Sequence, residues 1–254
     1  MSIQVDVSAA PTAAAIAALA PTGVLRAAIN TSNFLLVTGR DADGSPTGIS
    51  PDVARELARR LGVPITLLSY ASPGDLAAAA ATGVWDIGNI GAEPQRAETI
   101  AFTPAYSEIE CTFLVPSGSS LLSIDAVDQP GVRIASAPLA AFDLWLERNL
   151  KSAELVRASN LAGAFDLFVS EKLHALAGLR PGLIRSAEKL PGSRILDGKF
   201  TSVQQAIGTP AGRDEAGIGY LRTFVADIIA SGFVAERIAA HGVVGLSVAA
   251  GAPA

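Results

Sequence analysis

Apolar runs and amphipathic stretches alternate along the first part of the chain, which is typical of a parallel sheet covered by helices. After residue 50, Val53, Leu57 and Leu61 share one helical face, and charged residues share the opposite face. A shorter helix over 75–81 is expected to end at Gly83. Buried strands are expected at residues 25–29, 63–70 and 85–88.

The longer of these helices carries a start signal. Ser50 can accept hydrogen bonds from unpaired helical N–H groups, and Pro51 lacks the N–H that the first helical position would leave unpaired. Asp52 suits the positive end of the helix dipole, and Gly62 suits a helix end. We therefore predict a helix that Ser50 caps and that ends at Gly62.

The second half of the chain repeats this organisation. Residues 108–115 alternate between apolar and polar, which predicts an extended strand. Further strands and helices are expected at 132–136, 139–150, 155–156, 162–169, 173–178, 203–208, 215–230 and 234–240. Two α/β units connected near 108–116 follow from this pattern, and the last helices could return to the first unit.

An uncharged stretch near the amino terminus raises the question of a membrane span or a signal peptide. The apolar residues of 7–25 are mainly alanine, which contributes little transfer energy, and the preceding segment carries Asp6 where a signal peptide has basic residues. We expect a structured helix with Pro11 and Thr12 in its first turn and Pro21 at its end. A signal peptide is the alternative.

Composition narrows the function classes. The chain has 254 residues, with 19 Lys and Arg against 24 Asp and Glu, which gives a net charge of −5. Because no segment gathers the basic residues, we expect no nucleic-acid partner. A single cysteine, Cys111, excludes an internal disulfide and a cysteine-based zinc cluster. Because the chain has only two histidines in addition to this cysteine, we expect no metal site.

Common catalytic motifs are absent from the sequence. The segment from Gly192 to Gly198-Lys199-Phe200 is too long for a phosphate-binding loop and lacks its Ser or Thr. No G-x-G-x-x-G follows a predicted strand, and no G-x-S-x-G is present. We therefore expect no catalytic residues and no cofactor.

The central block GVWDIGNIGAEPQRAETIAFTPAY resembles the solute-binding proteins of ABC importers, in particular family 3, the amino-acid type. In that family a G-x-D segment precedes a helix with an arginine and an I-x-F-(S/T)-x-x-Y segment. Asp86, Arg96 and residues 100–106 match these features, although the spacing from Asp86 to Arg96 is slightly shorter than usual. The resemblance extends from about residue 24 to residue 243.

The resemblance implies a two-lobed type II periplasmic-binding-protein-like fold. Each lobe would be a mainly parallel sheet flanked by helices, and two crossover strands would join the lobes. Lobe 1 would comprise 1–108 plus 206–254, and lobe 2 would comprise 109–205.

The function that the resemblance implies is substrate binding for an ABC permease, without catalysis. A small ligand would be clamped between the lobes of a monomer in the periplasm, with the cytoplasm as the alternative location because no convincing signal peptide is present. Two other functions remain open. One is an enzyme similar to cyclohexadienyl or arogenate dehydratases, with Glu93 or Glu110 as the acid, and the other is an intracellular ligand sensor.

The resemblance also assigns ligand contacts in lobe 1. Arg96 would bind the ligand's carboxylate, which its planar guanidinium fits with two hydrogen bonds. Asn33, Phe34, Asn89 and Gly91 are expected at the carboxyl ends of strands, where open α/β sheets bind ligands. The structural alternatives are a surface Arg96 paired with Glu93 or Glu98 and a core position for Phe34.

In lobe 2, Ser136 and Ala137 precede a predicted helix, and the corresponding turn of the family helps to hold the ligand carboxylate. Helical N–H groups favour an anion there, with a plain cap at Ser136 as the alternative. Arg180 is a candidate second cation.

One departure from the family concerns ligand charge. Amino-acid binders have G-(R/K)-x-D-A-x-x-x-D where this chain has EKLHALAGL, so His174 and Leu179 replace both aspartates. The second aspartate pairs with the ligand's ammonium, and a buried unpaired ammonium costs several kcal/mol. Unless Glu93 or Glu110 takes this role, we expect a small organic anion in place of an ordinary α-amino acid.

Overall fold

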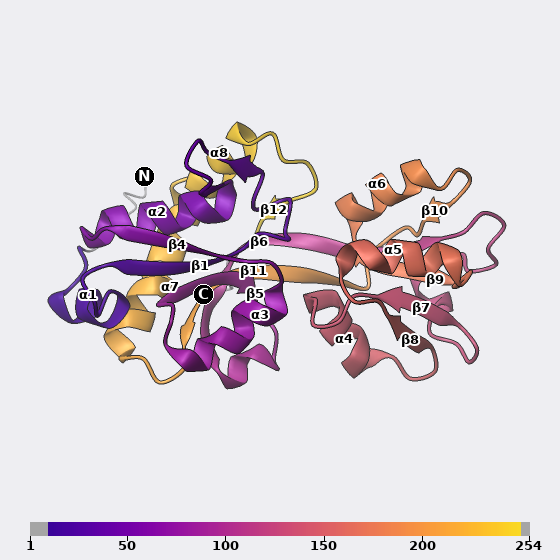
Figure 1. The fold of residues 1–254 in the computed structure, drawn as a ribbon, viewed down its shortest axis with the longest axis horizontal. Helices are drawn as coiled ribbons and strands as arrows, with labels where there is room; N and C mark the ends of the chain where they lie inside the picture. Colours follow the sequence, from indigo (N-terminus) through magenta and orange to yellow (C-terminus); the bar gives the residue numbers. More distant parts are fainter. Residues whose placement is uncertain (1–9, 250–254) are drawn as a thin grey trace, which may run out of the picture. The chain divides into compact units, whose positions relative to one another are not determined.

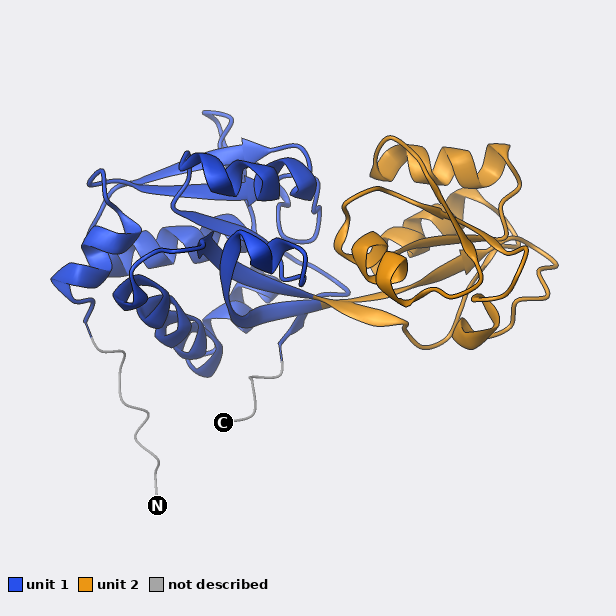
Figure 2. Ribbon diagram, turned by 90° about the horizontal axis from the view of Figure 1, so that it is seen from below, with its two compact units in different colours: residues 1–108, 204–254 blue, residues 109–203 orange. Residues whose placement is uncertain are grey.

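The structure, a computed structural model, describes residues 10–249, which divide into two compact units (Figure 2). Unit 1 contains the described residues up to 108 and from 204 onward, and unit 2 contains residues 109–203. The chain passes between them inside two long strands, β6 (Ile100–Val115) and β11 (Thr201–Pro210). The sequence-based division places the second boundary after residue 205, also inside β11.

The sheet of unit 1 is mainly parallel (Figure 1). Its strands, in spatial order, are β4 (Ile65–Tyr70), β1 (Leu25–Asn30), β5 (Ile87–Gly91) and the antiparallel β11. The register pairs Ile29 with both Ser69 and Asn89. The carboxyl ends of β4, β1 and β5 therefore lie at one edge of the sheet.

Helices cover the sheet of unit 1. The helices are α1 (Ala13–Leu19), α2 (Ile49–Leu61), α3 (Pro73–Ala78), α7 (Glu215–Ala230) and α8 (Phe233–Ala240). On the α3 side, Leu76 and the buried Trp85 pack against Ala28 and Ile90. Helix α2 contacts β1, β4 and α8, and α1 packs on α7. In residues 10–249 no single helix combines the length and hydropathy of a membrane span, whereas α7 and α8, bent by 63°, meet both criteria when taken together.

Unit 2 has the same construction in a smaller form. The parallel strands are β7 (Arg133–Ser136), β8 (Glu154–Arg157) and β9 (Ala175–Leu179), and β9 runs antiparallel to β6. The helices are α4 (Ala141–Asn149), α5 (Leu161–Ser170) and α6 (Arg180–Lys189). Apolar side chains fill both faces of this sheet, with Phe113 and Phe142 in one cluster and Phe168 in the other.

The expected α/β class is confirmed, and the predicted helix over 215–230 matches α7. The expected amino-terminal helix is present as α1, where Thr12 Oγ1 accepts a hydrogen bond from Ala15 N at 3.1 Å. Residues 7–9 of the uncharged stretch, and Asp6 before it, lie outside the described residues.

The prediction that Ser50 caps α2 is wrong. The helix begins at Ile49, and its cap residue is Gly48 with φ 139°. Ser50 lies in the first turn and donates its hydroxyl to Leu36 O at 3.4 Å. A tertiary contact therefore uses the side chain that the local pattern assigned to a cap.

Four short strands and one α-helix of residues 10–249 have no counterpart among the predicted elements. The strands are β2 (Gly39–Arg40), β3 (Pro46–Thr47), β10 (Arg194–Ile195) and β12 (Ser247–Val248). Strands β10 and β12 both pair with β6, and β2 pairs with β3. The helix is α6, whose first turn contains Pro181 and Gly182. Both residues are more typical of a turn, although proline is well tolerated at a helix start.

A buried ion cluster joins three segments of unit 1. The fully buried Asp86 carboxylate accepts hydrogen bonds from Arg26 Nε at 2.9 Å, Arg26 Nη2 at 2.8 Å and Arg213 Nη2 at 2.8 Å. The hydrogen bond to Asp86 raises the pKa of Arg26. Since Arg26 belongs to β1 and Arg213 follows β11, Asp86 links both segments to the start of β5.

We expect Asp86→Asn to lower the free energy of unfolding by about 3 kcal/mol, because two arginines lose their buried counter-charge. Urea unfolding measures this change. The exposed Asp125 is a control, and Asp125→Asn should change the free energy by less than about 0.5 kcal/mol. Equal unfolding midpoints for both variants would contradict the role of Asp86.

Gly208 in β11 allows close packing of β6. A Cβ at this position would collide with Ile100 Cγ2 and lie 3.1 Å from Phe102 Cε1. We expect Gly208→Ala to lower the free energy of unfolding by about 1–3 kcal/mol through overpacking. Gly219 in α7 has open space around it, so Gly219→Ala should raise stability by about 0.5–1 kcal/mol. Thermal unfolding should show shifts of opposite sign, and shifts in the same direction would disprove the packing argument.

Candidate functional site

Four of the predicted ligand contacts lie at the carboxyl-terminal edge of the unit 1 sheet. Asn89 and Gly91 are in the last part of β5, and Asn33 and Phe34 are in the turn that follows the neighbouring β1. Asn33 Oδ1 accepts a hydrogen bond from Leu35 N at 3.2 Å, which stabilises this turn. The four residues therefore belong to one edge, at which α/β sheets bind ligands.

Arg96 directs its guanidinium to the same edge. It begins the short 3-10 helix Arg96–Glu98, is only 5 % exposed, and donates from Nη1 to Gly91 O at 2.6 Å. Burial lowers the pKa of Arg96 to about 10, while the charge of the nearby Glu93 acts in the opposite direction. Arg96 is therefore protonated at neutral pH. The expected exposure of the alternative is wrong, whereas Glu93, one of the two glutamates named in it, does lie near Arg96.

The Asn89 side chain is the second polar group of this edge. It is 2 % exposed, and neither Nδ2 nor Oδ1 forms a hydrogen bond within the described protein. A buried amide without hydrogen bonds is unfavourable, since it has lost its water contacts without replacement. Asn89 can therefore donate to and accept from a bound polar group without giving up an existing contact.

Ser136 and Ala137 lie at the end of β7 in unit 2. Both are buried, and the Ser136 hydroxyl forms no hydrogen bond within the described protein. The first residue of α4 is Ala141 and its cap is Ala140, so the alternative of Ser136 as the helix cap is wrong. The first turn of α4 contains a residue that the sequence analysis missed.

That missed residue is Asp143. Its carboxylate is 1 % exposed and accepts hydrogen bonds from Leu139 N at 3.3 Å and from Arg157 Nε at 3.0 Å. The start of α4, which we expected to favour an anion, therefore already holds the protein's own carboxylate. An acidic residue in a first helical turn is the one local signal of this arrangement.

Arg180 begins α6 and is also paired. Its Nε donates to Glu110 Oε2 at 2.9 Å, and its Nη2 donates to Gly198 O. Glu110 additionally lies 3.9 Å from Lys199 Nζ. Within unit 2, the candidate second cation and one candidate ammonium partner therefore neutralise each other. Leu179, at the end of β9, provides no charge.

Comparison with known proteins identifies the family. The sequence profile of bacterial extracellular solute-binding proteins, family 3, matches residues 25–239. The chain belongs to this family. No sequence among the curated proteins matches it.

Solved structures similar to this solute-binding protein share its fold at low sequence identity. One is an ancestral amino acid-binding protein described as a precursor of cyclohexadienyl dehydratase. The two chains are 21 % identical, the match covers 89 % of this chain and 98 % of that chain, and the TM-score is 0.70. Another is an amino acid ABC transporter substrate-binding protein from Streptococcus pneumoniae bound to L-arginine, with 17 % identity, 88 % and 96 % coverage, and a TM-score of 0.70. A mutant of arginine-bound ArgBP from T. maritima has 19 % identity, 84 % and 100 % coverage, and a TM-score of 0.66. The two-lobed type II periplasmic-binding fold is thereby confirmed.

Residues 10–249 of this family 3 protein contain neither a cluster suited to a metal ion nor a histidine without a hydrogen-bond partner. Within residues 10–249, no three His, Cys, Asp or Glu side chains lie close enough together to hold a metal ion. Both histidines have hydrogen-bond partners, since His174 Nδ1 accepts from Arg133 N at 3.0 Å and His241 Nε2 lies 2.8 Å from Asp52. Cys111 is buried.

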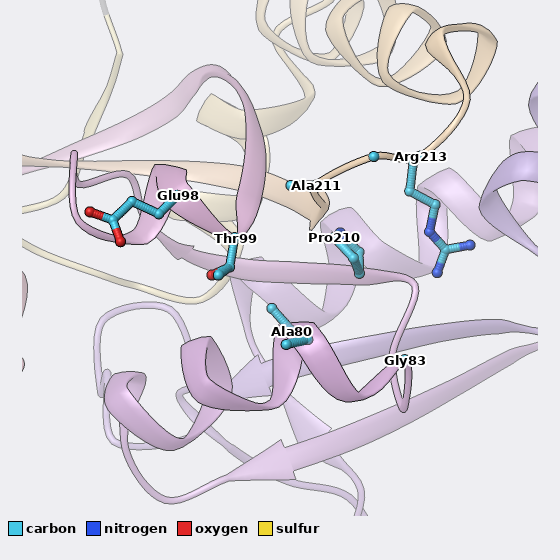
Figure 3. Close-up of a pocket in the computed structure, with 9 residues that line it drawn as sticks. Ala80, Gly83, Glu98, Thr99, Pro210, Ala211 and Arg213 are labelled. Carbon is cyan, nitrogen blue, oxygen red and sulfur yellow. The ribbon is translucent and has the colours of Figure 1, made fainter.

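A separate hollow lies at the opposite edge of the unit 1 sheet (Figure 3). It measures about 470 Å³ and is lined by Ala80, Gly83, Thr99, Pro210 and Arg213, among others. The register places it near the start of β5 and the end of β11. Because Arg213 is already paired with Asp86 and strand carboxyl ends are at the other edge, we do not assign the ligand to this hollow.

The lowered pKa of Arg96 predicts how carboxylate binding depends on pH. Affinity should be constant from about pH 7 to 9 and about tenfold weaker at pH 11, because Arg96 of the protein without ligand loses its proton near pH 10. The same shift should raise the free energy of unfolding above about pH 10, where the unfolded chain still binds the proton. Calorimetric titration at about pH 8 and 11 checks the first effect, and equal affinities would contradict the assignment.

Proposed function

We propose that this family 3 protein is the substrate-binding component of an ABC importer and binds a small organic anion through Arg96. The observation that carries the proposal is the buried, protonated Arg96 at the carboxyl-terminal edge of the unit 1 sheet. Burial strengthens the interaction of a guanidinium with a carboxylate because water screens it less. The ligand is bound and released to a permease without chemical change.

The charge distribution in unit 2 supports an anion over an α-amino acid. Leu179 stands where the resemblance places the aspartate that pairs with the ligand's ammonium, and Glu110 is engaged by Arg180. The solved relatives with bound arginine hold a ligand that carries a guanidinium in addition to its ammonium group. Of the two glutamates that could pair with a ligand's ammonium, Glu93 and Glu110, only Glu93 is not engaged by Arg180. Its charge already stabilises protonated Arg96.

Besides Arg96, residues of both units are proposed to contact the ligand. The Asn89 amide forms hydrogen bonds with a polar group of the ligand, and Asn33, Phe34 and the Gly91 backbone complete the unit 1 side. Ser136, Ala137 and Arg180 are the proposed contacts of unit 2. We further propose that the protein acts as a monomer outside the cytoplasm, in keeping with the extracellular description of its family.

Calorimetry with paired ligands tests the proposal. Wild-type protein should bind monocarboxylates and dicarboxylates more tightly than free arginine, lysine or neutral amino acids. Arg96→Ala should weaken carboxylate binding by roughly 10- to 100-fold, the factor that corresponds to a charge-assisted hydrogen bond. Arg96→Lys keeps the charge without the planar donor pair and should give an intermediate affinity.

The matched control is Arg222→Ala, which removes an exposed arginine of α7 and should leave every affinity unchanged. Thermal unfolding of each variant establishes that it is folded. Micromolar binding of a free amino acid in preference to every carboxylate would disprove the anion assignment. Carboxylate binding that is indifferent to Arg96 would disprove its role, and turnover of prephenate or arogenate would favour an enzyme.

A further inference from the structure

The turn after β1, which carries two of the proposed ligand contacts of unit 1, lies against the start of α2. Gly48, the cap residue of α2, has φ 139°, and a Cβ there would collide with Leu36 O and lie 2.8 Å from Thr38 N. Ser50 N donates to the same Leu36 oxygen at 3.1 Å. Because only glycine allows backbones to approach this closely, residues 36–38 are held next to the first turn of α2.

A second helix reaches the same segment through His241, which caps the end of α8. His241 Nδ1 lies 3.2 Å from Thr38 Oγ1, and His241 Nε2 lies 2.8 Å from Asp52 Oδ2. Asp52 belongs to the first turn of α2, and α2 and α8 contact each other (Figure 1). One imidazole ring therefore connects the end of the turn after β1 to both helices.

The chemistry of these partners assigns a role to each ring nitrogen of His241. An ionised carboxylate accepts hydrogen bonds and donates none, so Nε2 carries a proton beside Asp52. In the neutral ring, Nδ1 then accepts a hydrogen bond from the Thr38 hydroxyl. A proton added to Nδ1 makes it a donor to the same hydroxyl oxygen. The contact to Thr38 therefore exists in both charge states, and the ion pair with Asp52 exists only in the charged one.

The charged groups around this histidine and its partner Asp52 come from α2, α8 and the loop after β2. Arg55 of α2 lies 3.6 Å from Asp52, and Arg237 of α8 lies 3.9 Å from it. Arg55 also lies 3.9 Å from Asp41, and Arg237 pairs with Glu236. Two guanidiniums face three carboxylates, so a protonated imidazole brings the net charge of these groups to zero.

We propose that His241 is a positioning residue that stabilises the ligand-binding turn of unit 1, more strongly when its ring is charged. This inference rests on the proposed function, in which Asn33 and Phe34 of this turn contact the ligand, and deepens it. His241 acts on the turn through Thr38 and does not touch the ligand. Histidine side chains change charge between about pH 5 and 8, so the turn is more stable at pH 6 than at pH 8.

Amide hydrogen exchange of the protein without ligand tests the positioning role. The reporters are the N–H groups of Leu36 and Val37, which donate to Asn33 O at 3.0 Å and 2.9 Å. His241→Ala should lower their protection about 2- to 10-fold, the factor that corresponds to one hydrogen bond. Thr38→Val removes only the hydroxyl of an exposed side chain and should lower it similarly, so the test does not depend on the folding of His241→Ala.

The pH profile separates the charged ring from a purely structural contact. With the intrinsic exchange rates taken into account, wild-type protection of the two reporters should be about 2- to 5-fold higher at pH 6 than at pH 8, as expected for an exposed ion pair. His241→Gln keeps a neutral donor for Asp52 and should show equal protection at both pH values. His174→Gln removes the other histidine of the chain, which lies in unit 2, and should behave as wild type.

Three results would overturn the role of His241. They are equal protection in wild type, His241→Ala and Thr38→Val, a pH dependence that persists in His241→Gln, and a loss of protection spread evenly over unit 1. The last result would assign His241 a structural role only.

Calorimetry with acetate, hexanoate and succinate connects the turn to binding. His241→Ala should weaken the carboxylate binding of wild-type protein by about 2- to 5-fold, since a turn that is in place for less of the time lowers the apparent affinity. If protection falls while every affinity is unchanged, this inference is overturned and the role of Arg96 stands. If no carboxylate binds wild-type protein, or if binding is independent of Arg96, the proposed function fails and this inference fails with it as a statement about ligand binding.

Discussion

The buried carboxylate of Asp86 is the interaction on which the candidate site of unit 1 depends. Its hydrogen bonds to Arg26 and Arg213 join β1, the start of β5 and the chain that leaves β11. The position of β5 in turn sets Asn89 and Gly91 at the sheet edge, and the Gly91 carbonyl orients Arg96. The Asp86 charge buried at one end of β5 therefore supports the position of the buried Arg96 at the other end.

Charge pairs lie at the carboxyl-terminal edge of the unit 2 sheet. Unit 2 neutralises its own charges there, through Asp143 with Arg157 and through Glu110 with Arg180. At the corresponding edge of unit 1, the buried Arg96 lies near Glu93, and the Asn89 amide forms no hydrogen bond within the described protein. Relatives that bind arginine share the fold at 17–19 % identity. Such a fold tolerates this divergence because it requires apolar patterning and a few turns, whereas ligand charge depends on a few side chains.

The sequence predicted the helices and strands that show a hydrophobic pattern over many consecutive residues. The helix over 215–230 and the longer strands of both units follow from apolar periodicity, which a core-facing element must show. Failures occurred where distant groups compete with a local signal. Ser50 looks like a helix cap but bonds to Leu36 O, and the two-residue strand β12 exists only because β6 supplies its partner.

The sequence by itself determined the α/β class, the family and the residues worth testing, because periodicity and motif spacing are properties of neighbouring positions. It named Arg96 and Asn89 but not their environments. Only the tertiary structure decided that Arg96 is buried, that the Asn89 amide has no hydrogen-bond partner among residues 10–249, and that Glu110 pairs with Arg180, 70 residues away. Burial and charge pairing are set by groups that the fold brings together across long separations, so local patterns do not encode them.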